Sequence, residues 1–382
     1  MRKKMLAAAL FAGLIITGCK KNSDEGPGYP DPPTDQKDIA VVDNAVNSFM
    51  QKYSIPGVSI AVTRNDKLIY VKSYGKMSAA DNTPIANNHL FRIASISKPI
   101  TAVGIMKLLE ANKLTMDSKI FGAGSILEND FPSSKIASVS DLTVRHLLHH
   151  TSNLWPNDGN DPMFRQQNMN HQQLISWTLD NYNGNSVRGV HRYSNFGYCL
   201  LGRVIEKLSG KSYEQFIKDE VLKPAGITGM LIGGSTLGER KANEVLYTGQ
   251  DGFDPYIYNI QRMDSHGGWL ATATDLARFM SRVNGLAGKP DILQPATIST
   301  MTTRSVPSSN YASGWGVNDA NHWWHTGGLP GTATEIIRAA NGFGWVILCN
   351  SRNNGGAFSN DLDGLLWPFV NDNTPWQDID QF

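Results

Sequence analysis

Apolar residues follow two different spacings in the first third of this chain, and these spacings predict a helix followed by a hairpin. From Ile39 to Tyr53, apolar side chains recur every three or four positions, which predicts an amphipathic helix. Two apolar segments, 58–62 and 67–71, then flank Asn65-Asp66, and such a pair is typical of a β-hairpin. We therefore expect one helix and two antiparallel strands in this part of the chain.

A second hairpin is predicted far along the chain, with strands over 334–339 and 345–348 and a turn at Asn341-Gly342. Apolar positions at helical spacing follow it, at Leu362, Leu365, Leu366 and Phe369. Between the hairpins the pattern is largely helical, most clearly over 101–112, 172–181, 198–209 and 274–284. Strands near both ends with helices between them predict an α/β (α+β) fold. We expect one antiparallel sheet built from both chain ends with flanking helices, plus a mostly helical lobe.

The composition fits a compact folded protein and argues against nucleic acid as a partner. Hydrophobic residues make up 41% of the chain and charged residues 18%. The formal net charge is +1, from 35 Lys and Arg against 34 Asp and Glu, so no basic excess is present to bind phosphates. Cys199 and Cys349 lie in apolar runs, which predicts small buried thiols. A single disulfide between them is the alternative.

The first residues have the pattern of a targeting signal. Three basic residues at 2–4 precede an apolar run over 5–16, which is too short to span a bilayer as a helix. The run ends in Ile16-Thr17-Gly18-Cys19, which resembles a bacterial lipobox. We therefore expect a lipoprotein signal peptide over 1–18 and a lipid on Cys19.

The segment 19–38 is rich in proline and acidic residues and has no apolar periodicity, which predicts a flexible tether. The lipid anchor implies a lipoprotein of the bacterial cell envelope, which we expect in the outer membrane. Whether it faces the periplasm or the cell surface stays open.

Three short motifs carry the candidate chemistry, and the first is Ser95-Ile96-Ser97-Lys98. A serine before a helix is often only an N-cap. Lys98, however, lies one helical turn after Ser95, so its amine can approach the serine hydroxyl. A lysine needs a strongly lowered pKa to act as a base at neutral pH, and burial supplies shifts of the required size.

The second motif is Tyr193-Ser194-Asn195. A tyrosine phenolate is favoured beside a lysine ammonium, so we expect Lys98 and Tyr193 to share a proton and act together as the base for Ser95. Asn195 is two residues further on, and we expect its amide to contact the substrate and Lys98.

The third motif is His325-Thr326-Gly327-Gly328, which precedes the second hairpin and reads as the start of an edge strand. Glycines in such a strand let a substrate backbone approach closely. The backbone N–H of Gly328, with that of Ser95, would form an oxyanion hole.

Taken together, these motifs resemble those of the serine β-lactamase and penicillin-binding-protein-like hydrolases, in the class C β-lactamase, DD-peptidase and esterase branch. The resemblance covers about 39–371. Further similar segments are 147–154 (LLHHTSNL), 193–202 (YSNFGYCLLG), 224–226 (PAG) and 267–279. It implies an active serine at Ser95 and base partners at Lys98 and Tyr193. It also implies a structural or substrate-contacting Asn195, with the His325 strand as one wall of the site.

One residue departs from the β-lactamase pattern: His325 stands where those enzymes carry lysine. Histidine is mostly neutral at pH 7, so we expect weak β-lactamase activity and a loss of carboxylate binding between about pH 6 and 8. His146, His149 and His150 are spaced like metal ligands, but no further ligand cluster lies nearby in the sequence. We expect a structural loop there and no metal.

The sequence therefore predicts a hydrolase domain over 39–371 with a C-terminal tail over 372–382. The expected function is a serine hydrolase that forms an acyl-enzyme on Ser95 and cleaves an amide or ester of a small molecule or peptide, without a cofactor. A β-lactamase or DD-carboxypeptidase acting on peptidoglycan peptides is one alternative. A non-catalytic binding lipoprotein on the same fold is another. The oligomeric state stays open.

Overall fold

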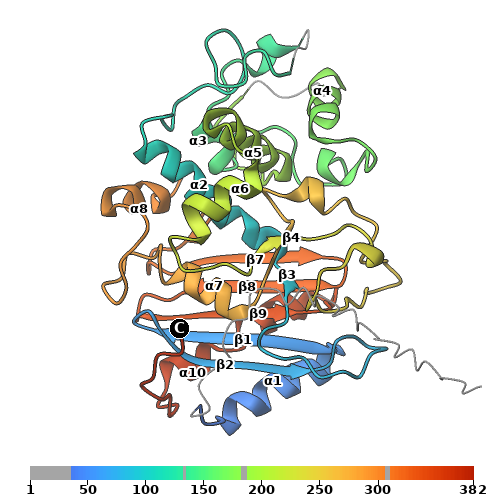
Figure 1. Cartoon of the computed structure of the whole chain (residues 1–382), viewed down its shortest axis with the longest axis vertical. Helices are drawn as coiled ribbons and strands as arrows, with labels where there is room; N and C mark the ends of the chain where they lie inside the picture. The colour runs from blue at the N-terminus through green and yellow to red at the C-terminus, as the bar shows by residue number, and fades with distance from the viewer. Residues whose placement is uncertain (1–35, 132–134, 182–186, 306–309) are drawn as a thin grey trace, which may run out of the picture.

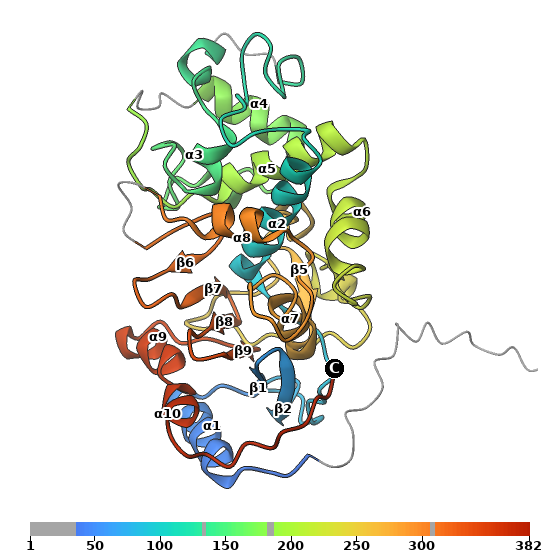
Figure 2. The same cartoon turned by 90° about the vertical axis from the view of Figure 1, so that its left-hand side faces the viewer.

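A six-stranded antiparallel sheet organises the molecule, and it joins the two ends of the chain as predicted. The computed structural model describes residues 36–131, 135–181, 187–305 and 310–382. The expected signal peptide, Cys19 and all but the last residues of the expected tether lie outside them. The strand order is β2-β1-β9-β8-β7-β6 (Figures 1 and 2). The strands are β1 Gly57–Arg64, β2 Lys67–Gly75, β6 Gly316–Val317, β7 Trp323–Leu329, β8 Thr332–Arg338 and β9 Phe343–Cys349.

Both faces of this sheet are covered, which explains why its central strands are apolar on both sides. On one face, α1 (Ala40–Tyr53), α9 (Gly356–Asp363) and α10 (Trp367–Asn371) pack together and share a hydrophobic core with the strands (Figure 2). On the other face, α7 (Ala273–Met280) lies across β1, β2 and β9. In β1, seven of eight residues are buried, in accordance with this double cover.

The remaining helices form the lobe above the sheet in Figure 1, and the largest hydrophobic core fills this lobe and its contact with the sheet. They are α2 Ser97–Glu110, α3 Val144–Leu148, α4 His171–Asn181, α5 Asn195–Ser209, α6 Tyr213–Ile217 and α8 Pro295–Thr302. A second, three-stranded sheet has the order β3-β5-β4, with β3 Phe91–Arg92, β5 Trp269–Ala271 and β4 Leu231–Ile232. None of the helices in the described residues is long and apolar enough to cross a membrane.

The two predicted hairpins are present, and their turns have the backbone that the sequence favours. Asn65 and Asp66 join β1 to β2 with φ of 50° and 65°, and Gly342 joins β8 to β9 with φ of 86°. The strand that carries the third motif, β7, pairs with β8 along its whole length. On its other side, β6 pairs only with Trp323 and Trp324. Among the described residues, the edge of β7 from His325 onwards therefore has no strand beside it.

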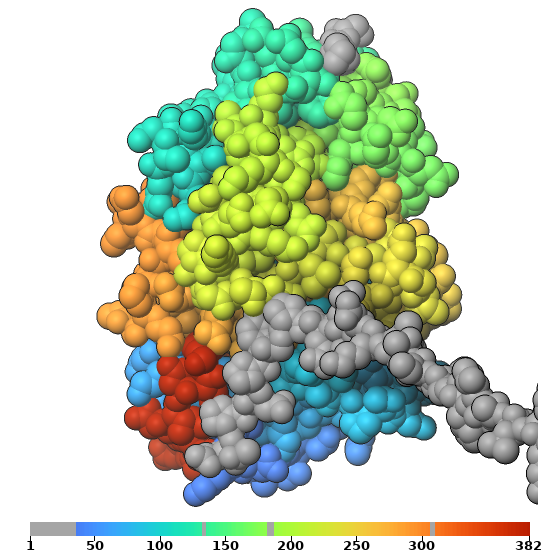
Figure 3. Space-filling view, in the orientation of Figure 1, coloured from blue at the N-terminus to red at the C-terminus, as the bar shows by residue number. Residues whose placement is uncertain are grey.

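The C-terminal residues lie along β2, the opposite edge of the sheet. The N–H of Gln381 donates to the carbonyl of Leu68 (3.0 Å), whose own N–H donates to the side chain of Asp380 (3.2 Å). The ring of Phe382 lies under the guanidinium of Arg278, 4.7 Å from ring centroid to cation. In Figure 3 the C-terminal region, coloured red, lies against residues from the blue, N-terminal part of the chain. The predicted tail is thus held on the surface of the folded domain.

Candidate active site

Ser95 lies in a single turn of 3-10 helix, Ala94–Ile96, between β3 and α2. The N–H of Ile93 donates to the carbonyl of Trp269, which ties the approach to this turn to β5 (3.0 Å). Ala94 has a φ of 48°, so the chain turns sharply just before Ser95. Ser95 is partly exposed, and no side chain caps the start of α2. Its hydroxyl is therefore available for other contacts.

Lys98 is fully buried and lies against Ser95. Its Nζ is 3.0 Å from Ser95 Oγ, 2.7 Å from Asn195 Oδ1 and 3.0 Å from the carbonyl oxygen of His266. Burial holds the pKa of Lys98 well below its usual range, although the charge of Asp161 partly opposes the shift. A neutral amine has two hydrogens, which Asn195 and His266 accept. In that neutral form the lone pair would face the hydroxyl of Ser95, to which the charged form donates its third hydrogen.

Tyr193 completes the group of side chains around Ser95. Its ring lies 4.6 Å from Lys98 Nζ, and its hydroxyl forms a hydrogen bond with Ser95. Burial raises the pKa of Tyr193 above its usual value, and the bond with Ser95 opposes this only in part. The direction differs from the phenolate expected from the sequence, because burial disfavours the charged form of the Tyr193 hydroxyl and also lowers the pKa of Lys98. The geometry thus favours Lys98 as the base, with a neutral Tyr193.

Asn195 connects Lys98 to a carboxylate that sequence reasoning missed. The hydroxyl of Ser194 accepts from the N–H of Gly197, which caps α5 and places Asn195 in its first turn. The Nδ2 of Asn195 donates to Oδ2 of the buried Asp161 (2.8 Å), so its Oδ1 faces Lys98. Burial raises the pKa of Asp161 to about 6. Asp161 also caps a helical turn through the N–H of Met163, and Asp-Pro at 161–162 is a cap signal, but nothing in the sequence links it to Asn195.

His325 is buried and neutral, which corrects the pH dependence expected from the sequence. Its Nδ1–H donates to the carbonyl of Thr326 (2.7 Å), which leaves Nε2 to accept from the hydroxyl of Tyr311 (3.1 Å). Burial lowers the pKa of His325 to about 3. Carboxylate binding cannot change between pH 6 and 8 through protonation of this ring, because the ring has no charge to lose there.

The glycines of β7 allow this strand to lie directly against the turn that carries Ser95. A Cβ atom on Gly327 would stand 2.3 Å from the hydroxyl oxygen of Thr334 and 2.5 Å from the carbonyl oxygen of Ile93. Thr334 itself donates to that carbonyl (2.9 Å). Thr326 and Gly328 are exposed beside it. β7 thus lies beside Ser95, as an oxyanion hole formed by the N–H groups of Ser95 and Gly328 would need. The role of the Gly328 N–H stays a prediction.

The three histidines at 146, 149 and 150 have contacts within the protein. His146 bonds the side chain of Thr143 in the cap of α3 (3.1 Å), and His149 bonds Ser313 (3.1 Å). The ring of His150 packs on Tyr193 with centroids 4.2 Å apart, and its Nδ1 accepts from the N–H of Ser194 (3.1 Å). Within the described residues no group of three potential metal ligands is found. Both Cys199 and Cys349 are free and buried, which confirms the prediction of buried thiols and not the alternative of a disulfide.

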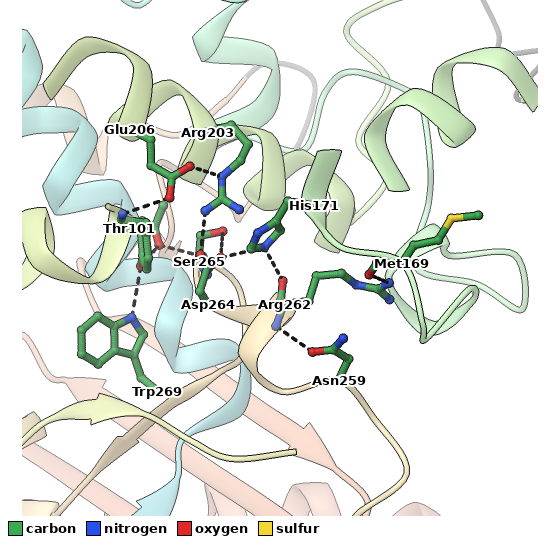
Figure 4. Close-up of polar contacts among 11 residues, drawn as sticks. Thr101, Met169, His171, Arg203, Glu206, Asn259, Arg262, Asp264, Ser265 and Trp269 are labelled. Carbon is green, nitrogen blue, oxygen red and sulfur yellow. Dashed lines mark hydrogen bonds and ion pairs between the residues drawn. The ribbon is translucent and has the colours of Figure 1, made fainter. Parts of the chain in front are cut away.

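A buried polar network holds the segment that accepts a hydrogen bond from Lys98 (Figure 4). The carboxylate of Asp264 accepts from Arg203 Nη2 (2.6 Å) and from the hydroxyl of Ser265 (2.9 Å). The carbonyl of Ser265 accepts from the hydroxyl of Thr101 on α2 (2.6 Å). Because Lys98 is on the same helix and bonds the next carbonyl, that of His266, the network fixes the Lys98 amine relative to Ser95.

Comparisons with known proteins place the chain in a family. The model of the Beta-lactamase family matches residues 42–365. "Penicillin-binding protein 4*" of Bacillus subtilis is 26% identical over 317 residues, which are 75% of this chain and 66% of that protein. "Protein flp" of Staphylococcus aureus is 24% identical over 318 residues, 81% of this chain and 62% of that protein. The chain therefore spans slightly less than two thirds of these curated relatives.

Two solved structures have the same fold. The D-amino acid amidase of Ochrobactrum anthropi aligns with a TM-score of 0.69 at 21% identity, over 87% of this chain and 99% of that one. The D-alanine carboxypeptidase AmpC of Burkholderia cenocepacia aligns with the same TM-score and identity, over 87% and 97%. The fold predicted from the sequence is thus confirmed. With most of its length matched by the family model, this chain belongs to the Beta-lactamase family.

Proposed function

We propose that this protein is a serine hydrolase that cleaves an amide or ester through an acyl-enzyme on Ser95. The observation that carries the proposal is the contact between Ser95 Oγ and the buried amine of Lys98 at 3.0 Å. A buried amine whose pKa is lowered by burial, within hydrogen-bonding distance of a partly exposed hydroxyl, is the arrangement a general base needs. The family match and the fold of the amidase and carboxypeptidase support the same chemistry.

The proposed reaction has two steps. Ser95 Oγ attacks the substrate carbonyl carbon as its proton passes to Lys98 Nζ, and the backbone N–H groups of Ser95 and Gly328 stabilise the oxyanion. When the tetrahedral intermediate collapses, the proton returns to the leaving amine or alcohol through the hydroxyl of Tyr193, which stays neutral overall. Water then attacks the ester on Ser95 with the same groups as base, releases the acid and restores the hydroxyl.

The first test is ester turnover by Ser95→Ala. With 4-nitrophenyl acetate as substrate, we expect kcat/KM to fall at least about 1,000-fold, because the nucleophile is removed. Ser48→Ala, on the exposed side of α1, is the matched control and should keep full activity. Equal turnover by the wild type and Ser95→Ala would contradict the mechanism. A wild type that turns over neither esters nor amides would favour the non-catalytic binding lipoprotein.

A β-lactamase or DD-carboxypeptidase is the second candidate function. It is supported by the names of the relatives, which include a penicillin-binding protein and a D-alanine carboxypeptidase. The neutral His325 weighs against efficient β-lactam hydrolysis, because the carboxylate of a penicillin meets no cation there. Incubation with benzylpenicillin followed by intact-mass analysis tests this function. A stable adduct on Ser95 would indicate a penicillin-binding enzyme, and steady loss of the drug would indicate a β-lactamase.

We also propose that the protein is attached to the bacterial cell envelope by a lipid on Cys19. The proposal rests on the lipobox-like sequence before that residue. Metabolic labelling with an alkyne fatty acid should modify the wild-type protein, and Cys19→Ala should lose both the label and the membrane association. Labelling that persists in Cys19→Ala would contradict the anchor.

A further inference from the structure

A cavity of about 270 Å³ lies next to the exposed Gly328 of β7, with Arg352 on its wall. Aromatic side chains form another wall, where the rings of Phe164 and Tyr258 meet edge to face with centroids 5.1 Å apart. These two rings pack on a small apolar cluster that includes Leu329 and Ala94, the residue before Ser95. The aromatic wall of the cavity therefore packs against the residue that precedes the candidate nucleophile.

Arg352 reaches this place because of the register of the sheet. Gly328 pairs with Ala333 of β8, and Ala333 pairs with Cys349 at the end of β9, so the three residues form a row across the sheet. The chain continues from Cys349 to Arg352, and the hydroxyl of Ser351 donates to the carbonyl of Thr248 (2.7 Å), which fixes this segment. A Cβ atom on Gly328 would stand 2.9 Å from Arg352 Nη1. The guanidinium thus lies directly over Gly328.

The guanidinium of Arg352 is half-buried and has no protein partner in the described part of the chain. Its Nε is buried without a hydrogen bond, and no acidic side chain there forms an ion pair with it. Arg203 and Arg92 also have a buried nitrogen without a hydrogen bond, but their guanidinium groups have other partners: Arg203 pairs with Asp264, and Arg92 donates to two backbone carbonyls. The nearby Asp251 accepts instead from the amide of Asn354. An arginine desolvated in this way is suited to a planar anion, which it binds through two parallel hydrogen bonds.

The position of this cavity relative to Ser95 decides which part of a substrate would enter it. Tyr193, the proposed proton donor to the leaving group, lies near His325, with ring centroids 6.3 Å apart. Gly328 is three residues further along β7, which is about 10 Å at the rise of a β-strand. A substrate that lies along the open edge of β7 therefore places its leaving group towards His325 and its acyl group towards Gly328 and Arg352.

We propose that Arg352 and the aromatic wall form a subsite for an acyl group that carries a carboxylate. The inference rests on the proposed function, and it narrows the substrates to amides or esters of dicarboxylic acids or of similar acyl groups with a distal anion. The carboxylate pairs with the guanidinium, and the carbon chain or ring of the acyl group packs on Phe164 and Tyr258. A neutral acyl group of equal length gains the apolar contact alone.

The test compares two esters of equal chain length, 4-nitrophenyl hydrogen glutarate and 4-nitrophenyl pentanoate. The wild type should prefer the glutarate in kcat/KM. Arg352→Gln should lower this preference about 10- to 100-fold, the range expected for hydrogen bonds between charged groups, and leave pentanoate turnover within about twofold. Arg304→Gln removes the same charge from another part of the molecule, where Arg304 pairs with Asp319, and should keep the preference. An unchanged preference in Arg352→Gln, or an equal loss in Arg304→Gln, would overturn the subsite.

A second measurement does not depend on turnover. Calorimetric titration with 4-phenylbutyrate should give a Kd at least about 10-fold weaker for Arg352→Gln than for the wild type, and no such difference for Arg304→Gln. Equal Kd values for the wild type and Arg352→Gln would refute the role of Arg352. Absence of any ester or amide turnover would instead refute the proposed function, so the two failures can be told apart.

Discussion

Replacing Asp161 by asparagine tests whether a buried carboxylate controls the base through Asn195. In the structure Asp161 accepts from Asn195 Nδ2 (2.8 Å), which directs Asn195 Oδ1 to the amine of Lys98. An asparagine at 161 offers either an oxygen or an NH₂ group, so Asn195 loses its fixed orientation and can turn a donor towards Lys98. The charge of Asp161 also raises the pKa of Lys98, so its removal weakens the base further.

The size of the effect follows from the contact that is lost. A hydrogen bond to a charged group contributes about 1.5–3 kcal/mol, and each 1.4 kcal/mol of barrier is a factor of ten. We therefore expect Asp161→Asn to lower kcat/KM for 4-nitrophenyl acetate about 10- to 100-fold at pH 7.5. The wild type should also lose activity as Asp161 is protonated below about pH 6. In Asp161→Asn this loss should move to lower pH, because the carboxylate is absent and the pKa of Lys98 falls.

The assay is a double-mutant cycle with Asn195→Ala, followed by stopped-flow ester hydrolysis from pH 5 to 9. If Asp161 acts through Asn195, the effect of Asp161→Asn should shrink to within about twofold in the Asn195→Ala background. Asp158→Asn, an exposed carboxylate of the same loop, is the control and should be nearly silent. An equal effect of Asp161→Asn in both backgrounds, with the fold intact, would refute the reasoning.

Three further predictions concern charge and packing. His325 should stay neutral from pH 6 to 8. The KM of an anionic ester should therefore have the same pH profile in the wild type and in His325→Gln. A KM that changes with pH in the wild type alone would contradict the neutral His325. In Gly327→Ala the added methyl group should push against the carbonyl of Ile93. We expect this to lower the free energy of unfolding by about 1–3 kcal/mol in urea and to lower kcat. Gly238→Ala is the control, because the space around Gly238 is open, and it should change neither quantity. Burial raises the pKa of Glu335 to about 8, above the ordinary 4.5, so the folded state holds the proton longer and the free energy of unfolding should decrease from pH 4.5 to 8. In Glu335→Gln this decrease should be smaller, by on the order of 4 kcal/mol; the same slope in both proteins would count against the buried acid.

The parts of the fold that the sequence predicts are those with a local period. The helix over 39–53 and both hairpins follow from the spacing of apolar residues and from turns at Asn65-Asp66 and Asn341-Gly342, and the structure has them within a few residues. The helix expected over 274–284 ends at Met280, because the chain turns at Ser281. Strands such as β3 and β4, with two residues each, have no period to detect.

In the candidate site, too, the contacts between residues close in the sequence could be predicted, and those between distant segments could not. Ser95 and Lys98 are one helical turn apart, so their contact follows from local geometry. Asp161 and Arg352 reach the site through the packing of segments far apart in the sequence, and no local pattern marks them. The charge states of Tyr193 and His325 could not be predicted from the sequence either. They depend on burial, and the sequence indicates only the ordinary pKa values.

The two edges of the large sheet are unlike each other, and this has a consequence for how another polypeptide can associate with the molecule. At β2, backbone groups that would otherwise attract a further strand are occupied by the chain itself: Gln381 and Asp380 bond Leu68, and the side chain of Gln36 bonds both the N–H and the carbonyl of Val71 (2.8 and 2.9 Å). In the described residues, β7 beyond Trp324 has no strand beside it on the side away from β8. We therefore expect a foreign peptide to add as a strand along β7, next to Ser95. A peptide bound in this way would have its main chain beside the nucleophile.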